Sequence, residues 1–302
     1  MPPPTPTTTP GARDVDPAPS AAALLVLAML ADARLPTGAH AHSAGLEPAV
    51  QAGLLTPPPP PPTLPRTLPP RAVDPAPGRN DVSRGQGEAD APHPTPLGAS
   101  RHPSPTVPGA RGRSRTEDVA RIPALAATRL RTVTATEAGA AVVARHWWLD
   151  RHDLTPVADA WAARTPSPAV RDAARRLGRG YLRLALALWP DELVGAFPPR
   201  AAPPRPLVAG AIGAVAGLDA LQVALLVGYD DVQTIASAAL KLAPLDPATT
   251  TRWVLDLHPA VAAMAADVAH LTDPDDIPSA GAPLTDAWAQ AHARTTRRLF
   301  HG

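Results

Sequence analysis

The residues best suited to chemistry are two histidines that form a His-x-His pair, His40 and His42. Imidazole nitrogens suit nickel and zinc, so the pair could hold such an ion on an extended segment. A competent site usually has a third ligand, and Glu47 is the nearest candidate, although on a helix it need not point toward the pair. We favour the alternative in which His42 organises the turn through local hydrogen bonds. No metal site is therefore expected, with His40 and His42 kept as weak candidates.

The sequence motifs of several enzyme classes are missing from the chain. There is no cysteine, which excludes thiolate metal sites and cysteine nucleophiles. Lys241 is the only lysine and no glycine-rich loop precedes it, so the chain has no Walker-type phosphate-binding loop. A GxSxG nucleophile elbow is also absent, and Ser43, Ser167 and Ser237 each suit a helix cap or a small buried position. We expect no catalytic residues, no cofactor bound by this chain, and no enzymatic activity.

Arginines recur at every fourth residue in one stretch, at Arg171, Arg175, Arg179 and Arg183. On a helix this spacing forms a cationic stripe beside an apolar one. A solvated face is the first interpretation, and an acidic protein partner follows closely because arginine donates planar, multidentate hydrogen bonds to carboxylates. Nucleic acid ranks far behind, since the net charge is +1 and aromatic residues make up only 3% of the chain.

The C-terminus places basic residues, Arg297 and Arg298, directly before an apolar pair, Leu299 and Phe300. A chain end of this kind is often frayed. An apolar pair left in water at a chain end would also make a simple docking peptide. From these residues alone the two interpretations have equal weight.

The composition favours an all-helical fold. Hydrophobic residues make up 45% of the chain and few of them are aromatic, so the core must consist mainly of Ala, Leu and Val, which suits closely packed helices. We expect one all-α domain of about eight to ten packed helices. The apolar run 21–31 resembles the core of a signal peptide, but acidic residues and prolines precede it, so we interpret it as a buried helix. The run 207–228 is interrupted by glycine and polar residues, which favours two core helices over a membrane span.

The 42 prolines mark where folded structure should stop. Residues 1–20 are expected to be a disordered tail, and 21–55 the first helices of the domain. Residues 56–116, which include six consecutive prolines, carry too little apolar surface to offset their ordering entropy and should be a disordered insertion. Residues 117–302 should complete the helical domain.

Helical periodicity and capping residues predict the individual helices. Ser167 is a good N-cap and Pro168 suits the first helical position, for a helix that ends near Trp189. We find no convincing strand pair. Apolar residues share one face at 24–31 and at 46–54, and Ser43 or Ala44 could start the second of these helices. Further helices are expected at Arg121 to Trp148, Ala209 to Gly217, Asp219 to Leu242, Ala248 to Leu271, and Leu284 to Phe300.

Two segments resemble a known family when they are taken together. Residues 30–47 contain Pro-Thr-Gly followed by His-Ser-Ala-Gly-Leu-Glu, which closely resembles the N-terminal signature of UreF urease accessory proteins. The C-terminal Arg-Leu-Phe at 298–300 is similar to the end of that family, and residues 164–183 and 237–245 are similar to its middle portions. The resemblance covers about residues 24–55 and 117–300, in order. It leaves the insertion unmatched.

The resemblance implies an all-helical cytoplasmic homodimer that binds UreD (also called UreH), the GTPase UreG and apo-urease, and that assists nickel incorporation. Nickel and GTP would be handled by partner proteins, with no nucleic acid and no membrane involved. Where the family often has His-Glu in the tail, this chain has His292 followed by Ala293, so a carboxylate contact there should be missing or supplied from elsewhere. The alternative is a helical metal-binding protein that uses His40 and His42 directly. The expected partner-binding residues are His42, Ser43, Glu47, Arg171, Arg175, Arg179, Tyr181, Arg183, Arg297, Arg298, Leu299 and Phe300.

Overall fold

The structure is a computed structural model that describes residues 20–32, 34–37, 42–54, 115–195, 197–198, 202–296 and 299–300. The expected all-α class is confirmed, because these residues contain helices and no strand. The elements are α1 (Ala21–Leu30), α2 (Leu46–Gln51), α3 (Arg115–Leu130), α4 (Val133–Leu149), α5 (Thr155–Ala163), α6 (Pro168–Leu188), α7 (Pro190–Leu193), α8 (Arg205–Val215), α9 (Ala220–Leu242), α10 (Pro247–Val268), a short 3-10 helix (Pro274–Asp276) and α11 (Pro283–Ala293).

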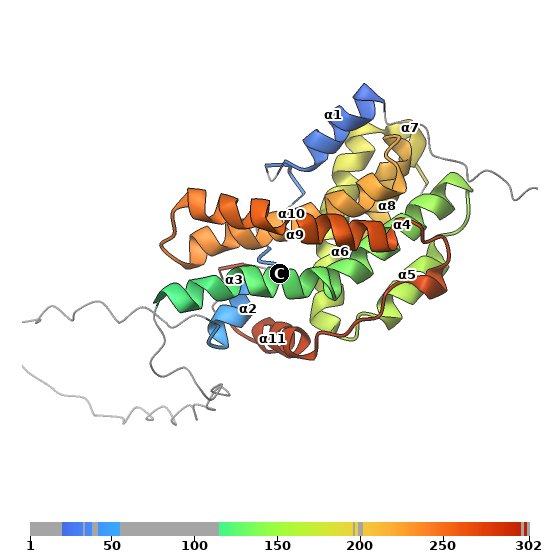
Figure 1. Cartoon of the computed structure of the whole chain (residues 1–302). Helices are drawn as coiled ribbons and strands as arrows, with labels where there is room; N and C mark the ends of the chain where they lie inside the picture. Colours follow the sequence, from blue (N-terminus) through green and yellow to red (C-terminus); the bar gives the residue numbers. More distant parts are fainter. Residues whose placement is uncertain are drawn as a thin grey trace, which may run out of the picture.

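Helix α4 is the centre of the bundle, and α8, α9 and α10 pack around it (Figure 1). Every side chain from Thr134 to Ala144 is buried, so α4 has no solvent-facing stripe along this stretch. A helix that is buried all round must be covered by neighbours on every side, which defines the core. Small residues allow the close approach: a Cβ added to Gly210 of α8 would lie 2.3 Å from the Ala141 carbonyl oxygen of α4.

Several predicted helix ends are confirmed. The Ser167 hydroxyl accepts a hydrogen bond from the Val170 amide at the start of α6, and that helix ends at Leu188. Asp219 caps α9 with a capping box. The apolar run 207–228 is divided between α8 and α9, and Gly217 turns the chain between them with φ of 70°. Among the described helices α9 alone is long and apolar enough to cross a membrane, and 61% of its apolar window is buried inside the protein, as in a core helix.

Three helix predictions need correction. The expected helix from Arg121 to Trp148 is broken at Thr132, between α3 and α4. The expected helix to Phe300 ends at Ala293, and the described residues after it, 294–296 and 299–300, are not helical. Helix α1 forms as predicted, but it is not a buried helix, because Leu25 is 72% exposed and the buried side chains are those of Ala23 and Leu30. Helix α5 was not predicted.

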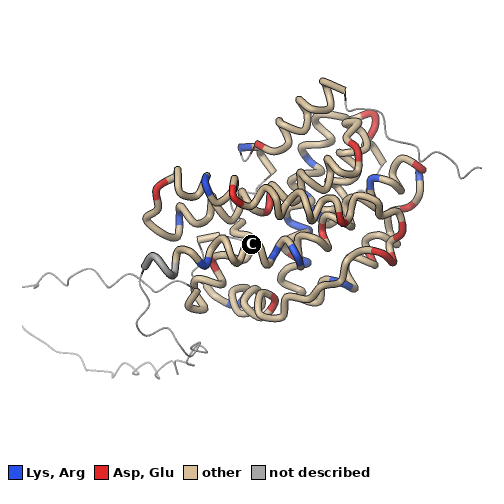
Figure 2. Tube along the Cα trace, viewed as in Figure 1, with Lys and Arg blue, Asp and Glu red and all other residues tan. Residues whose placement is uncertain are grey.

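The predicted disordered tail lies outside the described residues except for Ser20, which caps α1, and most of the predicted insertion also lies outside them. Helix α3 begins at Arg115, close to the predicted end of the insertion at 116. Figure 2 shows acidic and basic positions interspersed along the described trace, in keeping with a net charge of +1. The fold thus brings α2, α6, α9 and α11 around one end of α4, where the candidate site lies.

Candidate functional site

The signature segment forms a tight turn that leads into α2. Ala44 and Gly45 both have positive φ, at 47° and 80°, and glycine adopts this backbone region without strain. The Ser43 carbonyl accepts a hydrogen bond from the Leu46 amide, and the Ser43 hydroxyl accepts one from the Glu47 amide at 3.3 Å. The turn therefore fixes the position of Glu47 in the first turn of α2.

Glu47 holds the C-terminal end of the chain. Its carboxylate, in a residue only 3% exposed, accepts hydrogen bonds from the amides of Leu299 at 2.7 Å and Phe300 at 2.9 Å. The His292 Nε2 atom lies 3.0 Å from the same carboxylate and is the donor there, because a carboxylate can only accept. We call Glu47, His292 and the two tail amides the tail clamp. The carboxylate contact that was expected to be missing at His292 or supplied from elsewhere is thus supplied by Glu47.

The two apolar residues of the tail point in opposite directions. Phe300 is 1% exposed and belongs to the core, and the Lys241 ammonium lies 5.0 Å from the centre of its ring. Leu299 is 58% exposed. Arg297 and Arg298 lie outside the described residues. Only Leu299 of the apolar pair is therefore available on the surface in this conformation.

A network of buried charges lies next to the tail clamp. Arg129, at the end of α3, donates to the Asp231 carboxylate from Nε at 3.0 Å and from Nη2 at 2.7 Å. The Thr134 hydroxyl donates to the same carboxylate at 2.8 Å. Burial alone would raise the pKa of Asp231, but the Arg129 charge and these hydrogen bonds hold that pKa below its usual value. The break at Thr132 is what directs Arg129 and Thr134 toward one carboxylate.

Arg205 of α8 is the second cation of this network. It forms ion pairs with Glu137 of α4 and with Asp230 of α9, the latter at 2.6 Å. Burial raises the pKa of Asp230, although the nearby Arg205 charge opposes the rise. Burial and the Asp230 charge likewise raise the pKa of the Tyr181 hydroxyl. We call Arg129, Arg205, Glu137, Asp230 and Asp231 the buried charge network.

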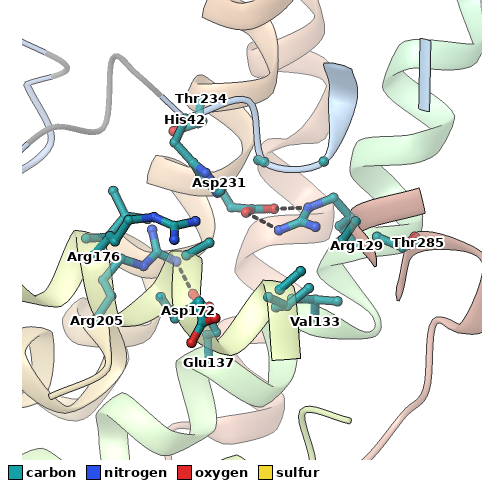
Figure 3. A pocket seen from close by; sticks show the side chains of 18 of the residues that line it. His42, Arg129, Val133, Glu137, Asp172, Arg176, Arg205, Asp231, Thr234 and Thr285 are labelled. Carbon is teal, nitrogen blue, oxygen red and sulfur yellow. Dashed lines mark hydrogen bonds and ion pairs between the residues drawn. The ribbon is translucent and has the colours of Figure 1, made fainter. Parts of the chain in front are cut away.

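A cavity of about 310 Å³ lies between the signature turn and the buried charge network (Figure 3). Its wall includes His42, Arg129 and Arg205, together with Arg176 of α6. His42 is half-buried, but its Nδ1 atom is fully buried and has no hydrogen-bond partner in the part of the chain that the structure describes. The predicted local hydrogen bonding of His42 is therefore not seen at this atom.

The surroundings of His42 disfavour the protonated form of its ring. Burial, followed by the charges of Arg129 and Arg205, lowers the pKa of His42 to about 3, so the ring is neutral at neutral pH. A field that opposes a proton also opposes a metal cation. Within the described residues no group of three or more His, Cys, Asp or Glu side chains could hold a metal ion. His40 lies outside the described residues.

The predicted arginine stripe lies on α6, where most of its members contact their own chain. Arg171 donates from Nη1 to the carbonyl oxygen of Thr165 at 2.6 Å, and Arg175 lies 3.5 Å from Asp172. Arg183 reaches the Pro36 carbonyl oxygen at 3.4 Å, while Arg179 is exposed. The stripe exists as a partly exposed face, and the buried side of α6 carries Tyr181.

Several residues that were predicted to bind partners are internal. Four of them are buried and cannot contact a partner directly in this conformation: Ser43, Glu47, Tyr181 and Phe300. They can affect binding only by positioning the residues above them. Sequence reasoning missed the buried charge network and Arg176. The available signal was the occurrence of acidic residues within long, Ala-rich apolar stretches, such as Glu137 in α4, where a buried charge needs a partner.

The fold and the site define a class of protein: in the described residues it is an all-helical protein whose buried arginines are paired with buried carboxylates. In it the signature turn and the C-terminal tail meet at Glu47. A model of the UreF family matches residues 116–258. The chain is 32% identical over 286 residues to a urease accessory protein UreF of Mycobacterium marinum, and 31% identical over 278 residues to one of Mycobacterium tuberculosis. Both alignments cover 92% of this chain and 98% of the relative. The chain belongs to the UreF family of urease accessory proteins, which act in urease maturation and are not enzymes.

Proposed function

We propose that this chain is the scaffold that links the GTPase UreG to UreD (UreH) and apo-urease during nickel incorporation, and that it acts as a cytoplasmic homodimer. Nickel and GTP are handled by the partner proteins in this proposal. Membership of a family of urease accessory proteins supports a role among urease maturation factors.

The tail clamp is the observation that carries the proposal. The N-terminal and C-terminal segments that resemble the family meet at the buried carboxylate of Glu47. That residue accepts a hydrogen bond from the amide of Leu299, 252 positions further along the chain. A buried carboxylate that accepts several hydrogen bonds is costly to move, so it holds the tail in one position. The clamp keeps Leu299 at the surface while Phe300 anchors the tail in the core. An exposed apolar residue on a fixed backbone suits docking to a partner.

The surface around this tail is proposed to contact UreD (UreH). Leu299 would make direct contact, together with Arg297 and Arg298. Ser43, Glu47 and Phe300 would act by holding the tail in position. The arginine face of α6 offers multidentate donors to a second, acidic partner surface. Its proposed members are Arg171, Arg175, Arg179 and Arg183, with Tyr181 on the buried side of the same helix.

Co-purification of the tagged full chain with its cognate UreD, UreG and apo-urease tests the proposal. We expect a complex with UreD, which then recruits UreG. Leu299→Ser should weaken capture of UreD about fivefold or more, since truncating an interface anchor typically costs more than 1 kcal/mol. Leu255→Ser on α10, another exposed leucine, is the matched control and should leave capture unchanged. Failure of the full chain to bind any of these proteins would refute the proposal.

The alternative function, direct metal binding by His40 and His42, is not supported by the surroundings of His42. The nearby arginine charges oppose a cation at that position. Nickel calorimetry on the wild-type chain and on a His40→Ala, His42→Ala double variant separates the two ideas. We expect equal, weak binding by both proteins.

A further inference from the structure

We infer that the cavity beneath the signature turn binds a small monoanionic carboxylate, which is an inference beyond the proposed scaffold function and independent of it. The cavity measures about 310 Å³, which is at the lower end of the range for small-molecule sites. It is therefore large enough for a ligand of a few heavy atoms. The groups on its wall decide what kind of ligand that is.

Two cationic donors face the cavity with hydrogen-bonding capacity to spare. Arg176 lines it and is exposed at its outer side, and no described residue makes an ion pair or hydrogen bond with its guanidinium (Figure 3). Arg129 uses Nε and Nη2 for Asp231, and its Nη1 atom lies beside Gly45, which also lines the cavity. Planar guanidinium groups match the geometry of a carboxylate.

His42 supplies a third polar group. Its Nδ1 atom is buried, lacks a partner among the described residues, and belongs to a ring that lines the cavity. A neutral imidazole carries one N–H, so the Nδ1–H tautomer can donate to a bound oxyanion. A buried polar atom without a partner is costly, and an oxygen ligand in the cavity would satisfy it.

The charges on the wall select a monoanion over a cation or a dianion. Burial and the charges of Arg129 and Arg205 disfavour a proton on His42, and the same arginine charges disfavour another cation there. Among the lining residues the cations Arg129, Arg176 and Arg205 are balanced by three acids, Asp172, Glu137 and Asp231. A dianion such as sulfate would be repelled by these carboxylates, and the one unpaired arginine could neutralise only half of its charge. The same arginine can neutralise a monoanion fully.

Titration of the full chain with sodium acetate, at ionic strength held constant with sodium chloride, tests the inference by ¹H–¹⁵N NMR. We expect saturable shifts at amides around the cavity, such as those of Gly45, Val133 and Thr234. Sodium sulfate should bind several-fold more weakly. Shifts that do not saturate, or tighter binding of sulfate, would overturn the inference.

Three variants locate the binding site. Arg176→Gln should weaken acetate binding about tenfold, in line with the loss of one charge-assisted hydrogen bond. Arg179→Gln, three residues along the same helix and outside the cavity wall, should leave it unchanged. Ala173→Leu should abolish binding by filling the cavity, with circular dichroism to show that the helices remain. Equal acetate affinity in the Arg176→Gln and Arg179→Gln variants would place any binding elsewhere and refute the inference.

Discussion

Replacing Glu47 by Gln should release the C-terminal tail without unfolding the bundle. The Glu47 carboxylate accepts from two tail amides and from His292. A glutamine has one acceptor oxygen and would place its amide NH2, itself a donor, next to other donors. Hydrogen bonds to a charged group contribute about 1.5–3 kcal/mol each. If Gln keeps one of the three, losing the other two costs at least about 3 kcal/mol, which corresponds to a rise of at least about 100-fold in the open population of the tail.

The burial of Phe300 opposes this release. Burying an aromatic side chain of this size contributes about 1.5–3 kcal/mol, which is comparable to the expected loss at Glu47. The tail of the Glu47→Gln variant should therefore fluctuate between docked and open states. Phe300→Ala should also open the tail, by removing the burial of the aromatic ring while the clamp residues stay unchanged. Both variants should capture less UreD than the wild type, if the proposed docking surface is correct.

Native-state hydrogen exchange at the Leu299 and Phe300 amides measures the release directly. We expect about 100-fold faster exchange in Glu47→Gln, with the amides in the centre of α4 unaffected. Glu192→Gln on α7, an exposed acid far along the chain, is the matched control and should exchange like the wild type. Unchanged protection of the tail amides in Glu47→Gln would refute the clamp, because a carboxylate that holds the tail cannot be replaced without effect.

Three further predictions concern stability. Asp231→Asn should lower the free energy of unfolding, measured by urea denaturation, by about 3–5 kcal/mol because it leaves the buried Arg129 without its counter-charge. Asp256→Asn, which removes an exposed ion pair, should change the same free energy by less than about 1 kcal/mol. The pKa of His42 is about 3 in the folded chain and about 6.5 in the unfolded chain, so between these values the unfolded state binds one more proton and stability falls as the pH decreases. His42→Gln should therefore remove about 1 kcal/mol of the stability difference between pH 7 and pH 5.5. Urea unfolding at both pH values measures this difference. Gly180→Ala should lower the melting temperature, since its Cβ would lie 2.0 Å from the Thr37 carbonyl oxygen.

The helices whose ends carry local signals were predictable from the sequence. The start of α6 is indicated by Ser167 followed by Pro168. The start of α9 is indicated by Asp219 followed three residues later by Gln222. The break at Thr132 carries no proline or glycine, so the sequence predicted one long helix there. What stabilises the break is the Asp231 carboxylate on a distant helix, which accepts from residues on both sides of it. Tertiary contacts of this kind override local propensity.

The candidate site was predicted in part. The signature and tail segments were both identified as interaction regions, and the partner-binding residues proposed in them remain predictions. Their mutual contact through Glu47 was not foreseen, because nothing in the residue types indicates which of many carboxylates receives a pair of tail amides. The buried charge network was missed for a related reason: charged residues in long helices are usually on a solvated face. Only the packing against α4 shows that Arg205 and Asp231 are internal.

A hydrogen bond joins the described residues that flank the Pro-rich segment. The described chain stops at Leu54 after α2 and resumes in α3, and the Arg121 Nη1 atom donates to the Leu54 carbonyl oxygen at 2.8 Å. This hydrogen bond is partly buried, and α2 and α3 both pack against α9. The signature turn, the clamp and the cavity are therefore built on residues whose positions are set by contacts within the bundle, with Leu54 held to α3 by this bond.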